Sequence, residues 1–502
     1  MFYCIKTLGF KGIEGFEVSA ETDVSAGLPS YNIVGLPDAA VKESRDRVIS
    51  ALRNSGFKPP AKKITVNLAP AEMKKTGSHF DLPISLGILI SCGILKPKIE
   101  MKNYFFLGEL SLDGEIRPVS GMLPMLIFLK ENYSSAVAVI PYENALEAKI
   151  SKIDYLCAQN LSEVCSFLKE EKNLIKKECE IFNPVNSQTL DFSEVKGQAK
   201  AKRAAEIAAA GFHNLIMVGP PGSGKSMIAK RLFTIMPPLS EKEILETTRI
   251  YSVWNKGATM IGERPFREPH HSISDIALLG GGQNPRPGEV SLAHNGILFL
   301  DELPEFSRSA LEGLREPLEN KKITVARAKD CVTFPANFLL AAAANPCPCG
   351  YYSHPARECV CTPLAVQKYR NRLSGPLLDR IDLHVEVSPV KYSQWEAAGK
   401  EETSSEIGVR VIKAREIQNK RNGEGIYNSY LSGRKLREIC ALPREVSDIL
   451  EKAMDAFGLS ARSLDKAVKI ARTIADLDGM EKIGKKHMAE ALSFRSLDKR
   501  II

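Results

Sequence analysis

The sequence predicts a multidomain α/β protein, in which an α+β domain precedes an α/β domain with a parallel sheet and then a helical region. Three observations lead to this fold class. The chain has 502 residues, more than the ~250–300 that one hydrophobic core usually supports. Strand-like and helix-like runs alternate from Asp191 onward, as in parallel sheets with crossover helices. Beyond about residue 392 the strand patterns stop and helical ones continue.

The first domain is expected over residues 1–165, where β-type runs such as ITVNLAP and AVAVIPY mix with a helical run, PDAAVKESRDRVISALRNSG. Residues 166–190 are charge-rich and then polar with an Asn-Pro pair, so we expect a linker, although the first half also suits a short solvated helix. The α/β domain is expected over 191–391. The helical region, 392–502, contains two helical runs that each end in glycine.

The composition is that of an ordinary globular protein, with 44% hydrophobic and 25% charged residues and a net charge of +8. This charge permits contact with nucleic acid but is modest for a domain that binds by charge alone. The N-terminus lacks the pattern of a signal peptide. The most apolar stretch, residues 80–95, is shorter than the ~20 residues of a spanning helix. We therefore expect a cytoplasmic protein with no membrane partner.

A glycine-rich motif follows the apolar run LIMV. The segment GPPGSGKS matches the pattern G-x-x-x-x-G-K-[ST] in the strand, loop and helix context that the motif requires. The glycines let backbone N–H groups surround phosphate oxygens, Lys225 neutralises the β and γ oxygens, and Ser226 offers a hydroxyl to Mg²⁺. The predicted ATP site consists of Gly219, Pro220, Pro221, Gly222, Ser223, Gly224, Lys225 and Ser226.

Two further apolar runs end in polar side chains. GILFLDE places Asp301 and Glu302 at the end of a buried strand. Asp301 is expected to hold Mg²⁺ together with Ser226, and Glu302 to polarise the attacking water. FLLAAAAN ends in Asn345, which could orient that water because the carboxyl ends of parallel strands meet at the ligand crevice. An acidic turn would also explain Asp301 and Glu302, but the motif upstream favours ATP hydrolysis.

Arg380 lies between Asp379 and Asp382 in the segment SGPLLDRIDLHVEV. A surface ion pair would explain it. The alternative is an arginine finger that reaches the γ-phosphate of a neighbouring subunit, which implies a ring-shaped oligomer.

Four of the 11 cysteines, Cys347, Cys349, Cys359 and Cys361, form a C-x-C-x9-C-x-C array in the loop 347–361. Structural disulfides are not expected in a reducing compartment. Paired C-x-C elements can bring four thiolates to one tetrahedral Zn²⁺, although C-x2-C is the commoner spacing. We expect structural zinc, with His354 as an alternative ligand. Reduced thiols without metal and redox-active pairs remain open alternatives.

Several long phrases are similar to one protein family over nearly the whole chain. DFSEVKGQ (191–198), the segment 266–306, LSGPLLDRIDLHVEV (373–387) and LSARSLDKAVKIARTIADL (459–477) resemble AAA+ ATPases of the magnesium-chelatase-like group, specifically the YifB/ComM family. The resemblance implies Walker A at 219–226, Walker B at Asp301 and Glu302, sensor 1 at Asn345, the arginine finger at Arg380 and sensor 2 at Arg462. It also implies an AAA+ lid over 392–502 and a hexameric ring.

The segment 267–293 resembles the helix-2 insertion of this clade, a hairpin that often projects toward the pore of the ring. Its two histidines, His270 and His271, could ligate metal, contact DNA or structure the loop.

The N-terminal domain resembles the Lon-type proteolytic fold related to domain 2 of ribosomal protein S5. Lon-type peptidases use a Ser-Lys dyad. Ser78 and Ser85 lie near the expected serine position, but Met125 occupies the lysine position. Because a serine without a neighbouring base is not activated, we expect a domain without peptidase activity that serves assembly or partner binding.

The ComM branch is similar to a helicase that promotes branch migration during recombination of transforming DNA. The resemblance therefore implies an ATP-driven motor that acts on single-stranded or branched DNA. Two alternatives are a magnesium-chelatase motor subunit and an ATP-dependent Lon-like protease. The chelatase interpretation lacks support from the D-x-S-x-S metal-adhesion motif of that enzyme's partner subunit, which does not occur here.

Overall fold

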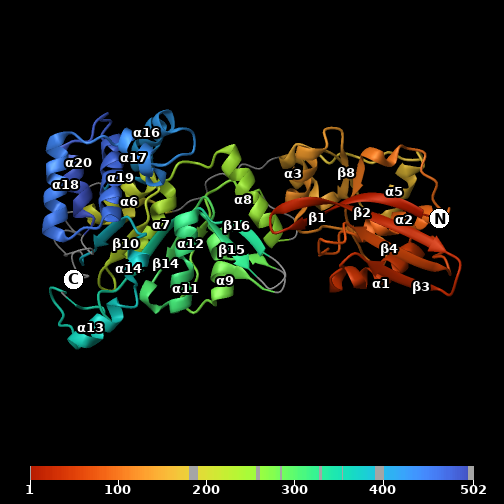
Figure 1. Ribbon diagram of the computed structural model, residues 1–502, viewed down its shortest axis with the longest axis horizontal. Helices are drawn as coiled ribbons and strands as arrows, with labels where there is room; N and C mark the ends of the chain where they lie inside the picture. Colours follow the sequence, from red (N-terminus) through yellow and green to blue (C-terminus); the bar gives the residue numbers. More distant parts are fainter. Residues whose placement is uncertain are drawn as a thin grey trace.

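The computed structural model is elongated, with three parts in a row (Figure 1). The N-terminal domain forms one end and the α/β domain the middle, while the C-terminal helices lie at the other end together with α13 (Pro363–Arg370) of the α/β domain. The structure describes residues 2–179, 190–255, 260–282, 285–326, 331–352, 354–389 and 401–495.

The N-terminal domain contains a four-stranded sheet of order β1-β2-β4-β3 and a parallel sheet of order β5-β8-β9. Helix α2 (Asp81–Ser91) packs on β1 and β2, and all its residues are buried. The most apolar stretch of the chain is therefore a core helix. The other elements are β1 (Phe2–Lys11), β2 (Glu14–Ser25), β3 (Ser30–Val34), α1 (Ala39–Asn54), β4 (Lys63–Ala69), β5 (Tyr104–Phe106), β6 (Glu109–Leu110), β7 (Ile116–Arg117), α3 (Met122–Asn132), β8 (Val137–Pro141), α4 (Ala145–Ser151), β9 (Asp154–Ala158) and α5 (Leu161–Leu168).

The middle domain is built on a five-stranded sheet of order β11-β14-β17-β10-β18, in which all pairs are parallel. The predicted parallel sheet is thus confirmed. Its strands are β10 (Leu215–Val218), β11 (Phe266–Arg267), β14 (Ile297–Leu300), β17 (Leu339–Ala344) and β18 (Leu383–Glu386). Every residue of β14 and β17 is buried, as expected for strands covered on both faces.

Helices and two short antiparallel pairs complete this domain. The helices are α6 (Ala199–Gly211), α7 (Lys225–Arg231), α8 (Glu241–Trp254), α9 (Asp275–Leu279), α10 (Glu289–Leu292), α11 (Arg308–Gly313), α12 (Arg315–Asn320), α13 (Pro363–Arg370) and α14 (Gly375–Leu378). The paired strands are β12 (Gly280–Gly281) with β13 (Arg286–Pro287), and β15 (Lys322–Ala326) with β16 (Cys331–Pro335).

The C-terminal helices share a hydrophobic core with the middle domain. Helix α6 buries mainly alanine side chains, and both α16 and α19 pack against it. Small side chains allow close approach of helices, so the C-terminal part is joined to the sheet through α6. These helices are α16 (Ser404–Asn422), α17 (Gly433–Ile439), α18 (Arg444–Phe457), α19 (Ala461–Leu477) and α20 (Lys485–Ser493).

The N-terminal and middle domains meet where α3 packs on α8. The Ser252 carbonyl of α8 accepts a hydrogen bond from the Gly121 N–H at 2.8 Å. The Ser252 hydroxyl donates to the Glu147 carboxylate, and both side chains are buried. A hydroxyl that satisfies a buried carboxylate makes this contact costly to separate.

The predicted linker, residues 166–190, is described only in part. Helix α5 crosses its first boundary and ends at Leu168. The carbonyl of Ile175 accepts a bond of 2.9 Å from the Cys157 N–H of β9, so this stretch packs on the N-terminal domain. Residues 180–189 and the predicted boundary at 391/392 lie outside the described residues.

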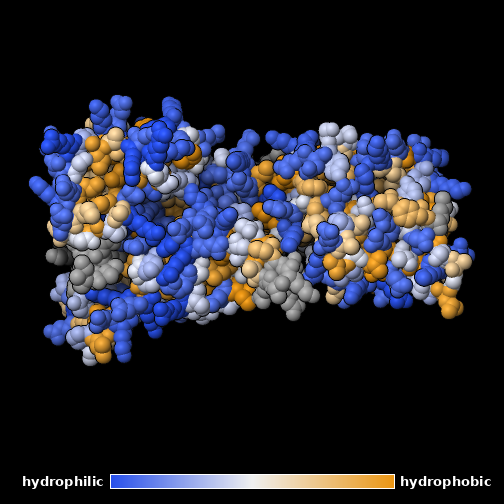
Figure 2. Space-filling view, in the orientation of Figure 1, coloured by the Kyte–Doolittle hydropathy of each residue, from blue (hydrophilic) through white to orange (hydrophobic). Residues whose placement is uncertain are grey.

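The face of the molecule in Figure 2 is mostly hydrophilic, and its hydrophobic residues form separate areas. Among the helices that the structure describes, none combines the length and the apolar character needed to cross a membrane.

Candidate nucleotide site

The loop between β10 and α7 forms an open cradle. Gly222 and Gly224 have φ values of 75° and 91°, a left-handed conformation that glycine adopts without strain. A Cβ placed on either residue would meet no atom within 4 Å. Lys225 is the first residue of α7, so the loop ends at a helix N-terminus, where backbone N–H groups favour anions. The predicted strand, loop and helix are all present.

Lys225 is directed at the backbone of its own loop. Its Nζ donates to the carbonyls of Gly219 and Pro220 at 2.8 and 2.9 Å, and the residue is 7% exposed. Burial lowers the pKa of Lys225, while the charges of Asp301 and Glu302 oppose that shift. A bound phosphate would add negative charge beside this ammonium group and so favour its charged form.

Asp301 follows β14 and lies beside the start of α7. Its Oδ2 accepts a hydrogen bond of 2.7 Å from the Ser226 hydroxyl, and its Oδ1 accepts one of 2.9 Å from the Glu302 N–H. A hydroxyl and a carboxylate held together are oxygen ligands of the kind that Mg²⁺ prefers. The donor set therefore fits the predicted metal site.

Glu302 has a left-handed backbone with φ 51° and ψ 45°, and its side chain is 52% exposed. Its Oε2 lies 3.3 Å from Nδ1 of His271. His270 instead contacts the Ser272 hydroxyl at 2.8 Å. The contact between His271 and Glu302 could not be predicted from the sequence, because the two residues lie far apart in the chain.

Asn345 stands at the same edge of the sheet. It follows β17, whose Ala344 is in register with Val218 of the parallel neighbour β10. Its Oδ1 lies 3.4 Å from Lys225 Nζ. The carboxyl ends of three adjacent strands thus bring Asn345, Asp301 and the phosphate-binding motif together, as the sequence predicted from strand ends.

Gln198 is a further residue that contacts the glycine-rich loop, and it was not among the predicted site residues. Its Nε2 donates to the carbonyls of Ser223 and Ser388 at 3.0 and 2.6 Å. The side chain therefore ties the loop to the chain that leaves β18. The Gly-Gln pair that ends DFSEVKGQ is the local sequence signal at this position.

Arg380 lies at the amino ends of the strands, opposite the carboxyl ends that carry the cradle. Strand β18 runs parallel to β10 with Leu383 opposite Leu215. Arg380 precedes Leu383, whereas Gly219 follows the far end of β10, which is four residues long. Since a strand rises ~3.3 Å per residue, ~13 Å of sheet separates the two edges. Arg380 therefore faces away from the cradle of its own chain.

Arg462 belongs to the same edge as Arg380. The Arg380 guanidinium binds the Glu319 carboxylate and holds the pKa of Glu319 below its usual range, and the charge of Arg462 acts in the same direction. One helical turn after Arg462, Lys466 Nζ donates to the Ile381 carbonyl at 3.2 Å. Helix α19, which carries Arg462, therefore packs against the segment that follows Arg380.

The two serines near the expected Lon-type dyad each donate a hydrogen bond to a group other than a lysine. The Ser78 hydroxyl donates to Glu109, and the Ser85 hydroxyl donates to the Leu82 carbonyl at 2.8 Å inside α2. Met125 is fully buried in a core with α3 and α4. Both hydroxyls therefore have acceptors other than a lysine.

The comparisons with known proteins agree over almost the whole chain. Three family models match: magnesium chelatase, subunit ChlI, over 191–395; subunit ChlI of Mg-chelatase, over 20–144; and magnesium chelatase, subunit ChlI C-terminal, over 401–495. Competence protein ComM of Haemophilus influenzae is 43% identical over 495 residues, which cover 97% of this chain and 96% of ComM. Protein YifB of Escherichia coli is 41% identical over 504 residues, 99% of this chain and 98% of YifB.

A more distant relative is DNA replication licensing factor mcm6 of Dictyostelium discoideum. It is 22% identical over 395 residues, which cover 74% of this chain and 41% of that protein.

Proposed function

The chain belongs to the ComM/YifB family of magnesium-chelatase-like AAA+ proteins, and we propose that it is an ATP-hydrolysing ring motor that acts on branched or single-stranded DNA. The observation that carries this proposal is the meeting of Lys225, Ser226, Asp301, Glu302 and Asn345 at one edge of the parallel sheet.

Each of these side chains has a chemical task in the proposal. The loop N–H groups and Lys225 bind the phosphates, while Ser226 and Asp301 hold Mg²⁺, which supplies neutralising charge to the phosphate oxygens. Glu302 Oε2 accepts the proton of the attacking water, and Asn345 orients that water. The half-exposed carboxylate of Glu302 is accessible for this role.

A ring of subunits completes the proposed site. Because Arg380 lies ~13 Å or more along the sheet from its own cradle, it serves the γ-phosphate of an adjacent subunit. The charge of Arg462 acts on Glu319, the ion-pair partner of Arg380, so we propose that sensor 2 acts across the same subunit boundary. A hexamer is the ring that the family resemblance implies.

DNA is the proposed substrate because of the relatives. One is named a competence protein and another a DNA replication licensing factor. Within the family resemblance, branch migration is the concrete activity. The 22 Lys and Arg against 17 Asp and Glu of residues 391–502 give a modest positive balance that suits phosphate contact without requiring it.

The decisive experiment is strand exchange on a synthetic four-way junction, with ATP hydrolysis measured in the same samples. We expect the wild-type protein to convert the junction in the presence of ATP, and Lys225→Ala to lose both activities. Conversion that is equal in both proteins would reject the motor role of this site. ATP hydrolysis that neither branched nor single-stranded DNA stimulates, without junction conversion, would reject the DNA substrate and favour the chelatase-type alternative.

A Lon-like protease is the weaker alternative, since Ser78 and Ser85 have acceptors other than lysine. Degradation of casein that Ser78→Ala abolishes would revive it.

A further inference from the structure

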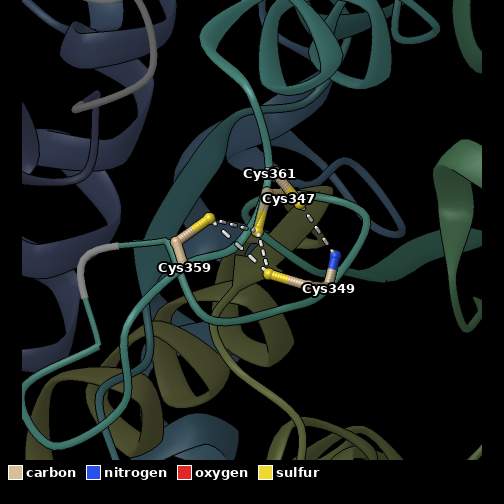
Figure 3. Close-up of side chains that lie close together, drawn as sticks. All are labelled: Cys347, Cys349, Cys359 and Cys361. Carbon is tan, nitrogen blue, oxygen red and sulfur yellow. Dashed lines mark hydrogen bonds between the residues drawn. The ribbon is translucent and has the colours of Figure 1, made fainter.

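The four cysteines of the 347–361 loop converge on one point. In Figure 3 their side chains point toward one another from two stretches of the loop. Their Sγ atoms all lie within 4.8 Å of one another. The separations are 3.4 Å between Cys347 and Cys349, 3.6 Å between Cys347 and Cys359, and 3.6 Å between Cys349 and Cys359.

These separations distinguish the interpretations left open by the sequence. A disulfide requires an S–S distance of ~2.05 Å, and these cysteines are free. A tetrahedron with Zn–S bonds of ~2.3 Å has S···S edges of ~3.8 Å. We propose that Cys347, Cys349, Cys359 and Cys361 form a structural Zn²⁺ site.

Backbone N–H groups support the thiolates that such a site requires. The Cys349 N–H donates to Cys361 Sγ at 3.4 Å, and the Tyr352 N–H donates to Cys347 Sγ at 3.3 Å. Outer hydrogen bonds of this kind orient metal ligands and stabilise their charge. His354 lies outside the cysteine group, and its Nδ1 accepts bonds from the N–H groups of Ala356 and Arg357. The ligand set is therefore four sulfurs.

Among the described residues of the loop 347–361, no hydrophobic side chain other than Cys347 is buried. Val360 is 86% exposed and Tyr352 is 41% exposed, whereas Cys347 is fully buried at the centre of the group. A short segment without its own core needs a staple, such as a metal, to keep one conformation. Four protein ligands leave no open coordination position, which marks a structural site and not a catalytic one.

The cage lies between the ATP loop and α13. A Cβ on Gly350 would stand 2.6 Å from Pro221 Cδ, so the cysteine loop touches the phosphate-binding loop directly. On the other side, the Arg370 guanidinium lies 4.7 Å from the Tyr352 ring centre. Zinc in this position braces the chain that leaves Asn345 against the nucleotide site.

Zinc per chain, measured by mass spectrometry on full-length protein purified without chelator, tests the proposal. We expect about one equivalent in the wild type and under about a tenth in the variant Cys359→Ser with Cys361→Ser. Cys331→Ser is the matched control, since Cys331 is an exposed free cysteine of the same domain; it should keep the wild-type content. Less than about half an equivalent in the wild type, or unchanged zinc in the double variant, would overturn the proposal.

A second measurement needs no cysteine variant. Replacement of the metal in wild-type protein by Co²⁺ should produce the intense visible bands and the sulfur-to-cobalt charge transfer of a tetrahedral four-thiolate site. Weak bands typical of oxygen ligands would reject the assignment. Neither measurement depends on ATP hydrolysis, so the zinc site and the proposed motor function can fail separately.

Discussion

In the proposed hydrolysis of ATP, Glu302 acts on the attacking water, and a neighbouring side chain holds Glu302 in place. The carboxylate of Glu302 stands where a strand ends, but His271 contacts it across 3.3 Å. His271 lies in the segment that follows β11. This strand is the neighbour of β14, which ends just before Asp301 and Glu302. We therefore interpret His271 as a positioning residue for Glu302.

His271→Ala is expected to lower kcat for ATP hydrolysis by up to about fivefold, because a partly exposed pair of this kind contributes at most about 1 kcal/mol. The KM for ATP should stay unchanged, since the phosphate-binding loop is not touched. His270→Ala should have a smaller effect, because His270 contacts Ser272 and the ring of His271 but forms no ion pair with Glu302. Equal effects of both substitutions, or a change in KM alone, would contradict the positioning role.

Asp382 is a buried carboxylate close in sequence to Arg380. It lies 3.1 Å from His213 Nδ1 and 3.3 Å from Lys466 Nζ. Burial alone would raise the pKa of Asp382, but Lys466 and His213 outweigh burial and hold it well below its usual value. The carboxylate therefore stabilises the folded state wherever it is charged.

Asp382→Asn is expected to reduce the free energy of unfolding by about 3–5 kcal/mol at neutral pH, because it leaves Lys466 with an uncompensated buried charge. The folded-state pKa is depressed, so the contribution is complete above the unfolded value of ~3.9 and is lost as pH falls below it. Thermal unfolding at pH 7 and pH 3 should show a difference between wild type and variant that shrinks in acid. Asp465→Asn, at an exposed position on α19, the helix that carries Lys466, should have little effect at either pH.

At the scale of elements, the cysteine loop and the phosphate-binding loop form one packed unit. Gly350 has φ 82° and touches Pro221, while its N–H donates to the Cys347 carbonyl at 3.0 Å. A side chain here would both strain the backbone and press on Pro221.

Gly350→Ala is therefore expected to weaken ATP binding several-fold, measured with a fluorescent ATP analogue. Gly479→Ala is the matched control: Gly479 also has a positive φ, of 68°, but nothing lies within 4 Å of its Cβ position. The control tests backbone strain without the clash. If both variants bind ATP like the wild type, the contact between the two loops has no role in nucleotide binding.

Across the whole molecule, the proposed ring requires that the two ends of the central sheet carry complementary halves of a site. One edge has the cradle and Glu302, and the other has Arg380 and Arg462. A heterologous contact between identical subunits would bring the two groups together, and it forms a ring when the rotation between subunits closes.

Mixing two inactive proteins tests this arrangement. Lys225→Ala and Arg380→Ala should each lack ATPase activity. In a mixture of the two variants at equal ratio, about a quarter of the subunit boundaries should combine an intact Lys225 with an intact Arg380, and ATPase activity should return in proportion. In the control, Arg380→Ala is mixed with a double variant that carries both Lys225→Ala and Arg380→Ala. No subunit of this mixture retains Arg380, so no activity should return. No recovery in the first mixture, or substantial activity of Arg380→Ala alone, would contradict a finger that acts between subunits.

The residues of the candidate nucleotide site could be singled out from the sequence because their signals are local. A glycine-rich loop after an apolar strand, and polar residues at the ends of two further apolar runs, identify Lys225, Ser226, Asp301, Glu302 and Asn345. The order of parallel strands and helices could be predicted for the same reason, since burial on both faces leaves unbroken apolar runs. The four cysteines were equally visible as a spacing pattern.

Local sequence patterns therefore suffice for the family, the parallel sheet and the polar residues at the carboxyl ends of its strands. Folding alone brings together side chains that are distant in the chain: His271 with Glu302, Asp382 with Lys466 and His213, and Gly350 with Pro221. It also packs α19, the helix of Arg462, against the segment that follows Arg380. Such contacts depend on how separate elements pack, and packing joins residues far apart in the chain without leaving a local pattern.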